Sequence, residues 1–417
     1  MREDVETVVI GAGQSGLAVS RLLTAHGRDH VVVDRGRPGE RWRCERWRSL
    51  RLLTPNWLTR LPGWSYAGDE PDGFMAASEV AQYLEGYAAG FCAPVIGSTI
   101  VHRVARSSGA FLVETSRGPW RARNVVVATG PHALPRTELP DSELPVIPVT
   151  RYREPGALPD GGVLVVGASA SGVQIARELA DAGRDVTLAV GRHTRMPRAY
   201  RGMDIFWWMQ ATGALARIVA RDGQPVRPEP SLQIVGAAPG SHHGVDLPAL
   251  AARGVRLTGR LVALSGRTAQ FDGSLPWNAA KSDAAMHRFL DRVDAYAAEA
   301  GLARELEPPL RPRAFVPQPG PLALDLRARG IGSVVVATGL QPDYAWLDVS
   351  VVGPDGLIAQ RRGVTEVPGL YVVGQPMQHR RDSTLIDGAR HNALDVVSHL
   401  LRSRLSDDVA GAAAVIV

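Results

Sequence analysis

The chain has 417 residues, of which 45% are hydrophobic and 21% are charged. At roughly 150 residues per domain this length suggests about two to three domains, and the composition excludes disordered, collagen-like and coiled-coil proteins. The net charge of +5 comes from 47 basic and 42 acidic residues, and Lys281 is the single lysine. Because the arginines are spread along the chain, we expect a solvated surface and no nucleic-acid partner.

The cysteines and the hydrophobic runs narrow the class further. Cys44 and Cys92 form no CxxC pair, which argues against a dithiol reductase and against a disulfide-stabilised secreted fold. No hydrophobic run approaches the roughly 20 residues of a membrane span. A strand and a glycine loop begin within the first residues, so we expect no signal peptide, no membrane association and a cytoplasmic location.

The first motif is a strand, a glycine turn and a helix. Residues 5–10 form an apolar, β-branched run, and GAGQSGLAVSRLL follows with apolar residues at helical spacing. Gly11, Gly13 and Gly16 match GxGxxG, whose glycines allow a tight turn, close approach to a pyrophosphate and helix–strand packing. The next predicted strand, HVVVD, ends in Asp34, where an acid can bind both hydroxyls of an adenosine ribose.

The same pattern recurs in the middle of the chain. The strand GGVLVV leads into GASASGVQIARELADAG, with Gly167, Ser169 and Gly172 at the three glycine positions, and then into the strand DVTLAV. No acid ends this strand, which continues as GRHTR at residues 191–195. Arginine offers bidentate donors to a 2′-phosphate, which a carboxylate would repel. The sequence therefore predicts FAD at the first site and NADPH, bound through Arg192, at the second.

Two further segments repeat the letters VVVATG, at residues 125–130 and 334–339, and each is predicted to be a buried strand that ends in a small-residue turn. The stretch between residues 198 and 319 is longer than a nucleotide-binding unit needs. It holds DIFWWMQ and a helix-like run at 282–301, and Trp207 and Trp208 are candidates either for a channel wall or for core packing. His242 and His243 lack partners at ligand spacing, so we expect no metal site.

These motifs together resemble the two-dinucleotide-domain flavoproteins, and within them the class B flavin monooxygenases, which include the animal flavin-containing monooxygenases, the plant enzymes of auxin synthesis and Baeyer-Villiger enzymes. The resemblance covers essentially the whole chain. Gly39, Glu40, Arg41 and Trp42 stand where the family has a GGTW-like turn touching the flavin. SLRLLTPNWLTRLPG is similar to a run beside the isoalloxazine, and VPGLYVVG is similar to the strand that closes the FAD domain.

The resemblance implies an α/β fold with two Rossmann-like domains. The FAD domain is expected to be discontinuous, at residues 1–135 and 333–417, with an NADPH domain and its extra substrate-side segment inserted at residues 136–332. The residues expected to contact the cofactors are Gly11, Gly13, Gln14, Ser15, Gly16, Asp34, Arg35, Glu40, Arg41, Trp42, Val101, Thr129, Gly130, Gly167, Ser169, Ser171, Gly172, Arg192, His193, Thr338, Gly339, Gly374 and Asp387.

Relatives keep an amide or a guanidinium near the flavin C4a atom, which makes Asn56, Thr54 and Arg51, with Arg48 beside it, the catalytic candidates. The segment His379 to Arg381 follows the last FAD strand closely enough to face the flavin, the substrate or solvent.

One family motif is missing. Members usually carry FxGxxxHxxxY before the second glycine strand, but this chain has Ser142, Leu144 and Pro148 at the phenylalanine, glycine and histidine positions and keeps only Tyr152. In the family this motif is thought to couple the domains, so its loss bears on whether the oxygen adduct of the flavin is stabilised.

The activity implied by the resemblance is oxygen transfer from a C4a-(hydro)peroxyflavin, formed with NADPH and molecular oxygen, to a small organic substrate. N-oxidation, sulfoxidation, ring hydroxylation and Baeyer-Villiger insertion are all compatible with these residues. An NADPH-driven oxidase or electron-transfer reductase without oxygen transfer is the first alternative, and a non-catalytic redox sensor is the second.

Overall fold

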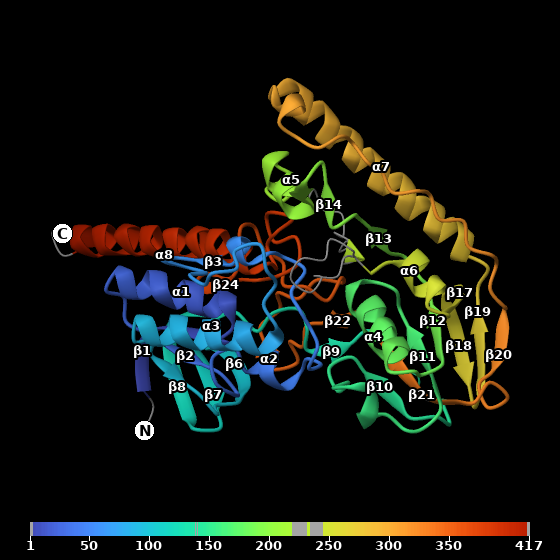
Figure 1. The fold of residues 1–417 in the computed structure, drawn as a ribbon. Coiled ribbons are helices and arrows are strands. Elements are labelled where there is room, and N and C mark those ends of the chain that lie inside the picture. Colours follow the sequence, from blue (N-terminus) through green and yellow to red (C-terminus); the bar gives the residue numbers. More distant parts are fainter. Residues whose placement is uncertain (1–2, 138, 140, 219–231, 234–244, 415–417) are drawn as a thin grey trace.

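The computed structural model describes residues 3–137, 139, 141–218, 232–233 and 245–414, and Figure 1 shows two α/β units side by side. The first unit contains both ends of the described chain, and the second is formed by the middle of the chain. The predicted α/β class with two parallel-strand units is confirmed. His242 and His243 lie outside the described residues.

The first unit is built on an eight-stranded sheet in the order β23-β6-β7-β8-β1-β2-β5, with β24 also beside β8. β1 is parallel to both β2 and β8, while β6, β7 and β8 form an antiparallel meander. The strand bounds are β1 Glu3–Ile10, β2 His30–Val33, β5 Val95–Ile96, β6 Val101–Ser107, β7 Ala110–Thr115, β8 Gly118–Val127, β23 Leu347–Asp348 and β24 Leu370–Val372.

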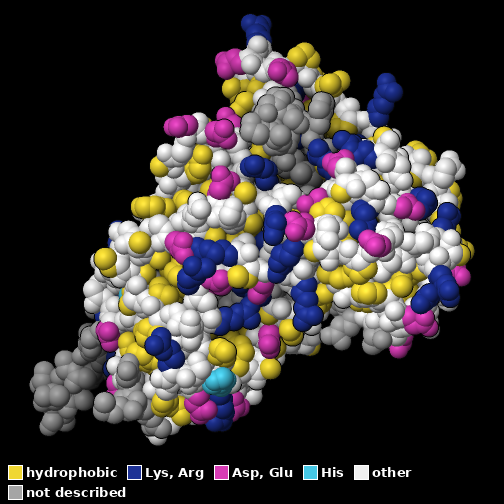
Figure 2. Space-filling view, turned by 60° about the horizontal axis from the view of Figure 1, so that its bottom comes forward, with side chains coloured by type: hydrophobic (Ala, Val, Ile, Leu, Met, Phe, Trp, Pro, Cys, Tyr) yellow, Lys and Arg dark blue, Asp and Glu magenta, His cyan; other side chains and the backbone are white. Residues whose placement is uncertain are grey.

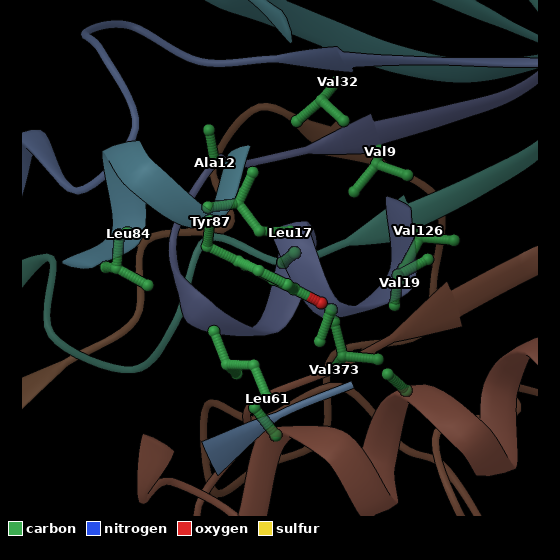
Figure 3. Packing of buried hydrophobic residues seen from close by; sticks show 14 of the residues in the cluster. Val9, Ala12, Leu17, Val19, Val32, Leu61, Leu84, Tyr87, Val126 and Val373 are labelled. Atoms are coloured by element: carbon green, nitrogen blue, oxygen red, sulfur yellow. The ribbon is translucent and has the colours of Figure 1, made fainter. Parts of the chain in front are cut away.

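Alternation along β1 divides the core of this unit into two faces. Val9 packs on one face with residues of the helices, and Val8 and Ile10 pack on the other. Figure 3 shows the helix-covered face, where Tyr87 reaches across the cluster and its hydroxyl donates to Pro62 O at 3.1 Å. The helices of the unit are α1 Gln14–Ala25, α2 Glu40–Cys44, α3 Ala77–Gly90 and α8 Ile386–Ala414.

The second unit has a five-stranded sheet in the order β10-β21-β11-β12-β17, and its paired neighbours run parallel throughout. Helix residues such as Ile175 and Leu179 cover one face, and a three-stranded sheet covers the other. The bounds are β10 Val146–Pro148, β11 Gly162–Val166, β12 Val186–Ala189, β17 Arg256–Thr258, β21 Ile331–Val336, β18 Leu261–Ser265, β19 Thr268–Phe271, β20 Ala323–Asp325, α4 Ala170–Asp181 and α6 Leu247–Ala252.

The extra segment forms a small apolar body of its own, in which α5 packs beside the long helix α7 (Figure 1). α7 begins at Leu275, earlier than the run at 282–301 suggested, because Pro276 is tolerated in its first turn. The bounds in this region are β13 Thr194–Arg195, β14 Ala199–Tyr200, β15 Met203–Asp204, α5 Ile205–Ala211, β16 Leu232–Gln233, α7 Leu275–Glu299 and the 3₁₀ turn Leu302–Arg304.

Two crossings join the units and lie side by side. β9 (Leu134–Pro135) pairs antiparallel with β22 (Leu340–Gln341), each a few residues after a VVVATG segment. β21 belongs to the sheet of the second unit up to Val336, so the predicted boundary at 332/333 divides a strand. We place the second crossing after Val336 for that reason. The remaining short elements are β3 Arg60–Leu61, β4 Trp64–Ser65 and the 3₁₀ turns Asn56–Leu58 and Pro155–Ala157.

The surface agrees with a well-solvated protein. Figure 2 shows acidic and basic side chains interspersed over the face it presents, with basic ones gathered most densely near the middle. None of the helices in the described ranges combines the length and the apolarity that a membrane span requires.

Candidate cofactor and active site

The first glycine loop connects β1 to α1 and lies against the end of β8. Gly11 has φ +112°, and a Cβ at this position would lie 2.6 Å from Ala128 O. A Cβ at Gly16 would lie 1.8 Å from Gly11 O, whereas the space beside Gly13 is open. Glycine is therefore required at two positions by the protein itself, and at the third only if a ligand approaches.

Asp34 supports this loop from the end of β2. Its carboxylate accepts hydrogen bonds from Ala12 N at 2.7 Å and from Gly36 N at 2.8 Å. These bonds hold the carboxylate beside the turn and leave lone pairs for further donors. Arg35, the next residue, is exposed and pairs with Glu45.

The second glycine loop repeats this geometry. Gly167 has φ +105°, and its Cβ would lie 2.6 Å from Ala337 O, while a Cβ at Gly172 would lie 1.8 Å from Gly167 O. Ser169 is at the N-cap position of α4, where its side chain makes no capping hydrogen bond, and Ser171 lies in the first turn. The VVVATG repeat now has a physical explanation, because each copy ends with a small Ala-Thr-Gly turn on which a glycine loop rests.

The polypeptide after β12 separates two arginines with different roles. Arg192 is exposed and makes no hydrogen bond or ion pair with another described residue. Arg195 is buried and pairs with Asp246 at 2.8 Å and Asp283 at 2.7 Å. These two ion pairs give it a structural role. His193 lies between the two arginines, buried, with Nδ1 on Gly191 O and Nε2 without a partner in the described ranges.

Each Ala-Thr-Gly turn carries an unsatisfied hydroxyl. Thr129 Oγ1 and Thr338 Oγ1 are buried without a hydrogen-bond partner among the residues that the structure describes. Buried hydroxyls normally have partners, so a ligand or water is expected at both. Gly130 and Gly339 follow them with φ of +70° and +98°.

The helix α2 joins the first unit to the junction. Arg41 donates to Thr129 O at 3.3 Å and to His132 O, and it pairs with Glu45 at 2.8 Å. Trp42 packs partly against the cores of both units. Glu40 accepts a hydrogen bond from Cys44 Sγ and another from Arg37, which together lower its pKa to about 2.

The three catalytic candidates lie on one loop, but two of them are already engaged. Asn56 is buried, donates to Glu70 O and accepts from Met75 N, both at 2.9 Å. Arg51 is exposed and donates to Phe74 O at 2.8 Å. Through these contacts both side chains connect the loop to the backbone of residues 70–75. A role at the flavin stays a prediction for both. Thr54 is half-buried in the same loop.

The C-terminal part returns to the first glycine loop. Gly374 has φ +79°, and a Cβ there would lie 2.6 Å from Ser15 Oγ. Asp387, at the start of α8, is buried and paired with Arg60 at 2.6 Å and Arg390 at 2.9 Å. Its carboxylate is thus neutralised, and only its backbone remains available to a flavin.

One group of side chains in the described ranges could geometrically hold a metal ion. Ligand atoms of Asp382, Asp387 and His391 lie within 4.8 Å of one another. Arg380 pairs with Asp382 at 2.7 Å, and Asp387 has its own two arginines, so the carboxylates already have cationic partners. This pairing explains the group without a metal.

The positions of the missing family motif have structural roles. Ser142 Oγ donates to Leu144 O at 2.9 Å, and Pro148 ends β10. Tyr152 is almost fully buried, and its hydroxyl donates to Glu178 in α4 at 2.8 Å. The retained tyrosine therefore ties the linker to the second unit.

Tryptophan burial decides between the two interpretations of the WW pair. Trp208 is fully buried and donates from Nε1 to Tyr200 O at 2.7 Å, so it is a core residue. Trp207 is half-buried and packs edge-on against it at 4.7 Å between ring centroids.

Two residues at the site were not singled out from the sequence. Gln233 is fully buried and donates to Ala168 O, in the second glycine loop, at 2.5 Å. Arg198 is buried between the units. No motif marks either position, because Gln233 donates to Ala168 O and Arg198 donates to Leu53 O, both far away in the chain.

Two further residues expected to contact the cofactors lie at the starts of elements: Gln14 is the first residue of α1 and Val101 is the first residue of β6.

The arrangement fits two dinucleotides. Each unit offers a glycine loop at a helix N-terminus, where backbone N–H groups and the helix dipole favour a pyrophosphate. Each also offers a free buried threonine hydroxyl, and the open space at Gly13 leaves room for a phosphate.

Comparisons with known proteins agree with this description. A family model of pyridine nucleotide-disulphide oxidoreductases matches residues 8–203. An "uncharacterized oxidoreductase CzcO-like" of Geobacillus kaustophilus is 31% identical over 417 residues, covering 96% of this chain and 99% of that protein. YUCCA4 of Arabidopsis thaliana, a probable indole-3-pyruvate monooxygenase, is 28% identical over 207 residues, covering 48% of this chain and 50% of that protein.

The solved structure of a flavin-containing monooxygenase from Stenotrophomonas maltophilia has a TM-score of 0.66 and 20% identity, and the match covers 96% of this chain and 99% of that chain. This likeness shows a shared fold. The identity to the Geobacillus protein extends over nearly the full length of both chains. The chain therefore belongs to the family of CzcO-like oxidoreductases, within the two-dinucleotide-domain flavoproteins that include the class B flavin monooxygenases, and it is a flavin-dependent oxidoreductase with FAD and NADPH as cofactors.

Proposed function

We propose that this chain is a monooxygenase that transfers one atom of molecular oxygen to a small organic substrate. The observation that carries the proposal is the opposite charge of the residues after two matching glycine loops: Asp34 follows β2, whereas Arg192 follows β12. Such a pair of sites suits a hydride donor beside a flavin. Cys44 and Cys92 are separate and free, so the electrons have no dithiol to enter.

We assign the FAD domain to residues 1–135 and 337–417 and the NADPH domain to residues 136–336. The residues assigned to FAD are Gly11, Gly13, Gln14, Ser15, Gly16, Asp34, Arg35, Glu40, Arg41, Trp42, Val101, Thr129, Gly130, Gly374 and the backbone of Asp387. Those assigned to NADPH are Gly167, Ser169, Ser171, Gly172, Arg192, His193, Thr338 and Gly339.

The protein's contribution is position and exclusion of water. When bound, FAD would supply the redox chemistry, namely hydride acceptance from NADPH and reaction with oxygen. Arg41 fixes the α2 turn against the Ala-Thr-Gly turn, and Trp42 closes the contact between the two cores. The hydroxyls of Thr129 and Thr338 supply hydrogen bonds to the two cofactors.

We place the substrate beside the loop that follows Arg51, which is apolar. The loop after Arg51 places Leu53 and Trp57 against the cluster formed by α5 and α7. An apolar wall favours an uncharged substrate such as a thioether, an amine in its neutral form, an aromatic compound or a ketone. The proposed partners are thus a small molecule and oxygen.

The test is rapid mixing of the NADPH-reduced protein with oxygenated buffer in the absence of substrate. A near-ultraviolet absorption band that forms and persists before oxidised flavin returns supports oxygen transfer. Immediate return of oxidised flavin with one peroxide per NADPH contradicts it and favours the oxidase or electron-transfer activity. The missing family motif, with Pro148 at the histidine position, is the observation on which that second activity depends.

A further inference from the structure

A buried arginine crosses the junction between the two units. Arg198 is 4% exposed, and its two terminal nitrogens both donate to Leu53 O, at 2.9 and 2.7 Å. Asp204 lies 3.3 Å from the same guanidinium. The ring of Phe74 lies 4.5 Å from the guanidinium carbon and the ring of Phe206 lies 5.7 Å from it.

These partners come from opposite sides of the junction. Leu53 and Phe74 belong to the first unit, and Leu53 is in the segment that resembles the flavin-side run, while Asp204 and Phe206 belong to the extra segment of the second unit. A planar guanidinium that donates two hydrogen bonds and stacks on a ring has a defined orientation, which a flexible ammonium would lack. Arg198 therefore fixes where Leu53 lies relative to the second unit.

The segment that carries Arg198 starts at the proposed 2′-phosphate site. His193 is five residues upstream, and between them Arg195 is anchored to Asp246 and Asp283, with its backbone N–H on Ser282 Oγ at 2.8 Å. This anchoring makes the segment a rigid part of the second unit. When the second unit changes position, Arg198 must therefore move with it.

On the side of the first unit, Arg198 contacts the loop beside the proposed flavin site. Leu52 N donates to Met75 O, and Asn56 joins the same stretch through Glu70 and Met75. The loop is thereby a single hydrogen-bonded body, and Leu53 O is the carbonyl by which Arg198 holds it. Leu53 and Leu58 also pack against the apolar α5–α7 cluster, which stabilises the contact between the units. Packing alone does not set the orientation of the loop.

We propose that Arg198 is a positioning residue that couples the NADPH site to the flavin-side loop, so that occupation of the second dinucleotide site tightens the first. The inference rests on the proposed positions of FAD and NADPH. It does not depend on oxygen transfer. Coupling between two sites is reciprocal, so it is measurable as a change in either binding constant.

The experiment is a linkage titration of the apoprotein. The FAD dissociation constant is measured by flavin fluorescence with and without saturating NADP⁺, in the wild type and in Arg198→Met. Arg201→Met is the matched control, because Arg201 is in the same segment but pairs with Asp294 on α7 and does not contact the flavin-side loop.

In the wild type we expect NADP⁺ to tighten FAD binding by about fivefold or more, the lower end of ordinary coupling. In Arg198→Met the ratio should fall to about one, while the NADP⁺ affinity of the apoprotein stays within about twofold. Arg201→Met should keep the wild-type ratio. A wild-type ratio of one, an unchanged ratio in Arg198→Met or an equal loss in Arg201→Met would each overturn the proposal.

Two further variants cover the case in which Arg198→Met does not fold. Arg198→Lys keeps the charge opposite Asp204 and one donor, and it should restore part of the ratio. Phe74→Leu removes the stacking surface but leaves the charge pair, and it should lower the ratio. Trypsin provides a second readout, since cleavage after the exposed Arg51 should be slowed by NADP⁺ in the wild type and not in either Arg198→Met or Phe74→Leu.

Because both readouts concern binding, a protein that couples its sites but never oxygenates would support this inference and contradict the proposed monooxygenase activity. A protein that oxygenates without the linkage would do the reverse.

Discussion

The two glycine loops are nearly superimposable in their local geometry, yet the polypeptide diverges where each second strand ends. Gly11 and Gly167 both have positive φ, and a Cβ at either would lie 2.6 Å from a carbonyl of the neighbouring Ala-Thr-Gly turn. After β2, however, a carboxylate supports the loop, and after β12 an exposed arginine has no protein partner in the described part of the chain. Pyrophosphate binding constrains backbone shape in both units, while ribose recognition is left to single side chains.

The units also differ in the middle glycine position. Gly13 has open space beside it, and Ser169 already carries a side chain at the equivalent place. The first unit therefore leaves room for closer approach of a phosphate than the second does. We expect this difference to appear as tighter binding of FAD, which stays on the enzyme, than of NADPH, which must leave after each turnover.

The largest effect should come from the third glycine of each loop. Gly16→Ala and Gly172→Ala place a methyl group 1.8 Å from a carbonyl oxygen of the same loop. If the loop shifts to relieve this overpacking of about 3 kcal/mol, the lost geometry corresponds to roughly a hundredfold in dinucleotide affinity. Gly16→Ala should be isolated without FAD, whereas Gly172→Ala should be yellow but not reduced by NADPH. Flavin absorbance and anaerobic reduction measure the two outcomes.

Gly13→Ala is the control for that pair, because the apoprotein has room for the methyl group. Its apoprotein should unfold at the wild-type temperature while its FAD affinity falls. If Gly172→Ala loses FAD as readily as Gly16→Ala does, the two loops are not separate sites and the comparison fails.

A smaller effect is expected from the arginine that distinguishes the second unit. Arg192→Ala removes a charge-assisted hydrogen bond worth about 1.5 kcal/mol to a 2′-phosphate, so the Michaelis constant for NADPH should rise about tenfold. The constant for NADH, which lacks that phosphate, should change less than about twofold. Arg177→Ala, which removes a half-buried arginine on α4 that pairs with Asp181, should leave both constants unchanged. Equal increases for NADPH and NADH in Arg192→Ala would disprove the ribose assignment.

The smallest effect concerns a buried histidine of the first unit. Burial lowers the pKa of His30 from its ordinary 6.5, and Ser20 Oγ lies 2.8 Å from its Nε2. The unfolded chain therefore takes up the proton first as the pH falls, and stability is lost below about pH 6.5. In His30→Gln the drop in unfolding temperature between about pH 7.5 and pH 5.5 should shrink by no more than a few degrees.

Thermal unfolding of the holoprotein at each pH measures this change. The exposed His102→Gln serves as its control and should reproduce the wild-type slope. A His30→Gln slope that equals the wild-type slope would show that the neutral imidazole does not contribute to the acid sensitivity.

Local elements and tertiary features differ in how far they could be predicted from the sequence. The strands, glycine turns and following helices were predicted correctly because they depend on local patterns of apolar residues and on the spacing of glycines. The boundary at 332/333 was misplaced because β21 reads as the twin of β8 in sequence, and only strand pairing shows that it completes the second sheet. Trp208 could not be assigned to the core or to a channel without knowing what packs around it.

The sequence could not show which partners the catalytic candidates have, for a related reason. Asn56 and Arg51 have suitable chemistry, but their hydrogen bonds go to the backbone of residues 70–75, and no local pattern reveals that these segments meet. Arg195 resembled a phosphate ligand in sequence, and the fold pairs it with Asp246 and Asp283.

The sequence by itself determined that the chain folds as two nucleotide-binding units that differ in the residues after their second strands, since strand, turn and helix follow from residue types close together in the chain. The tertiary structure alone decided which polar side chains remain free. Arg192 has no partner among the residues that the structure describes, while Arg195 and Arg198 are buried and paired, although all three lie within seven residues. The physical reason is that burial and pairing depend on segments brought together from distant parts of the chain, which local spacing does not encode.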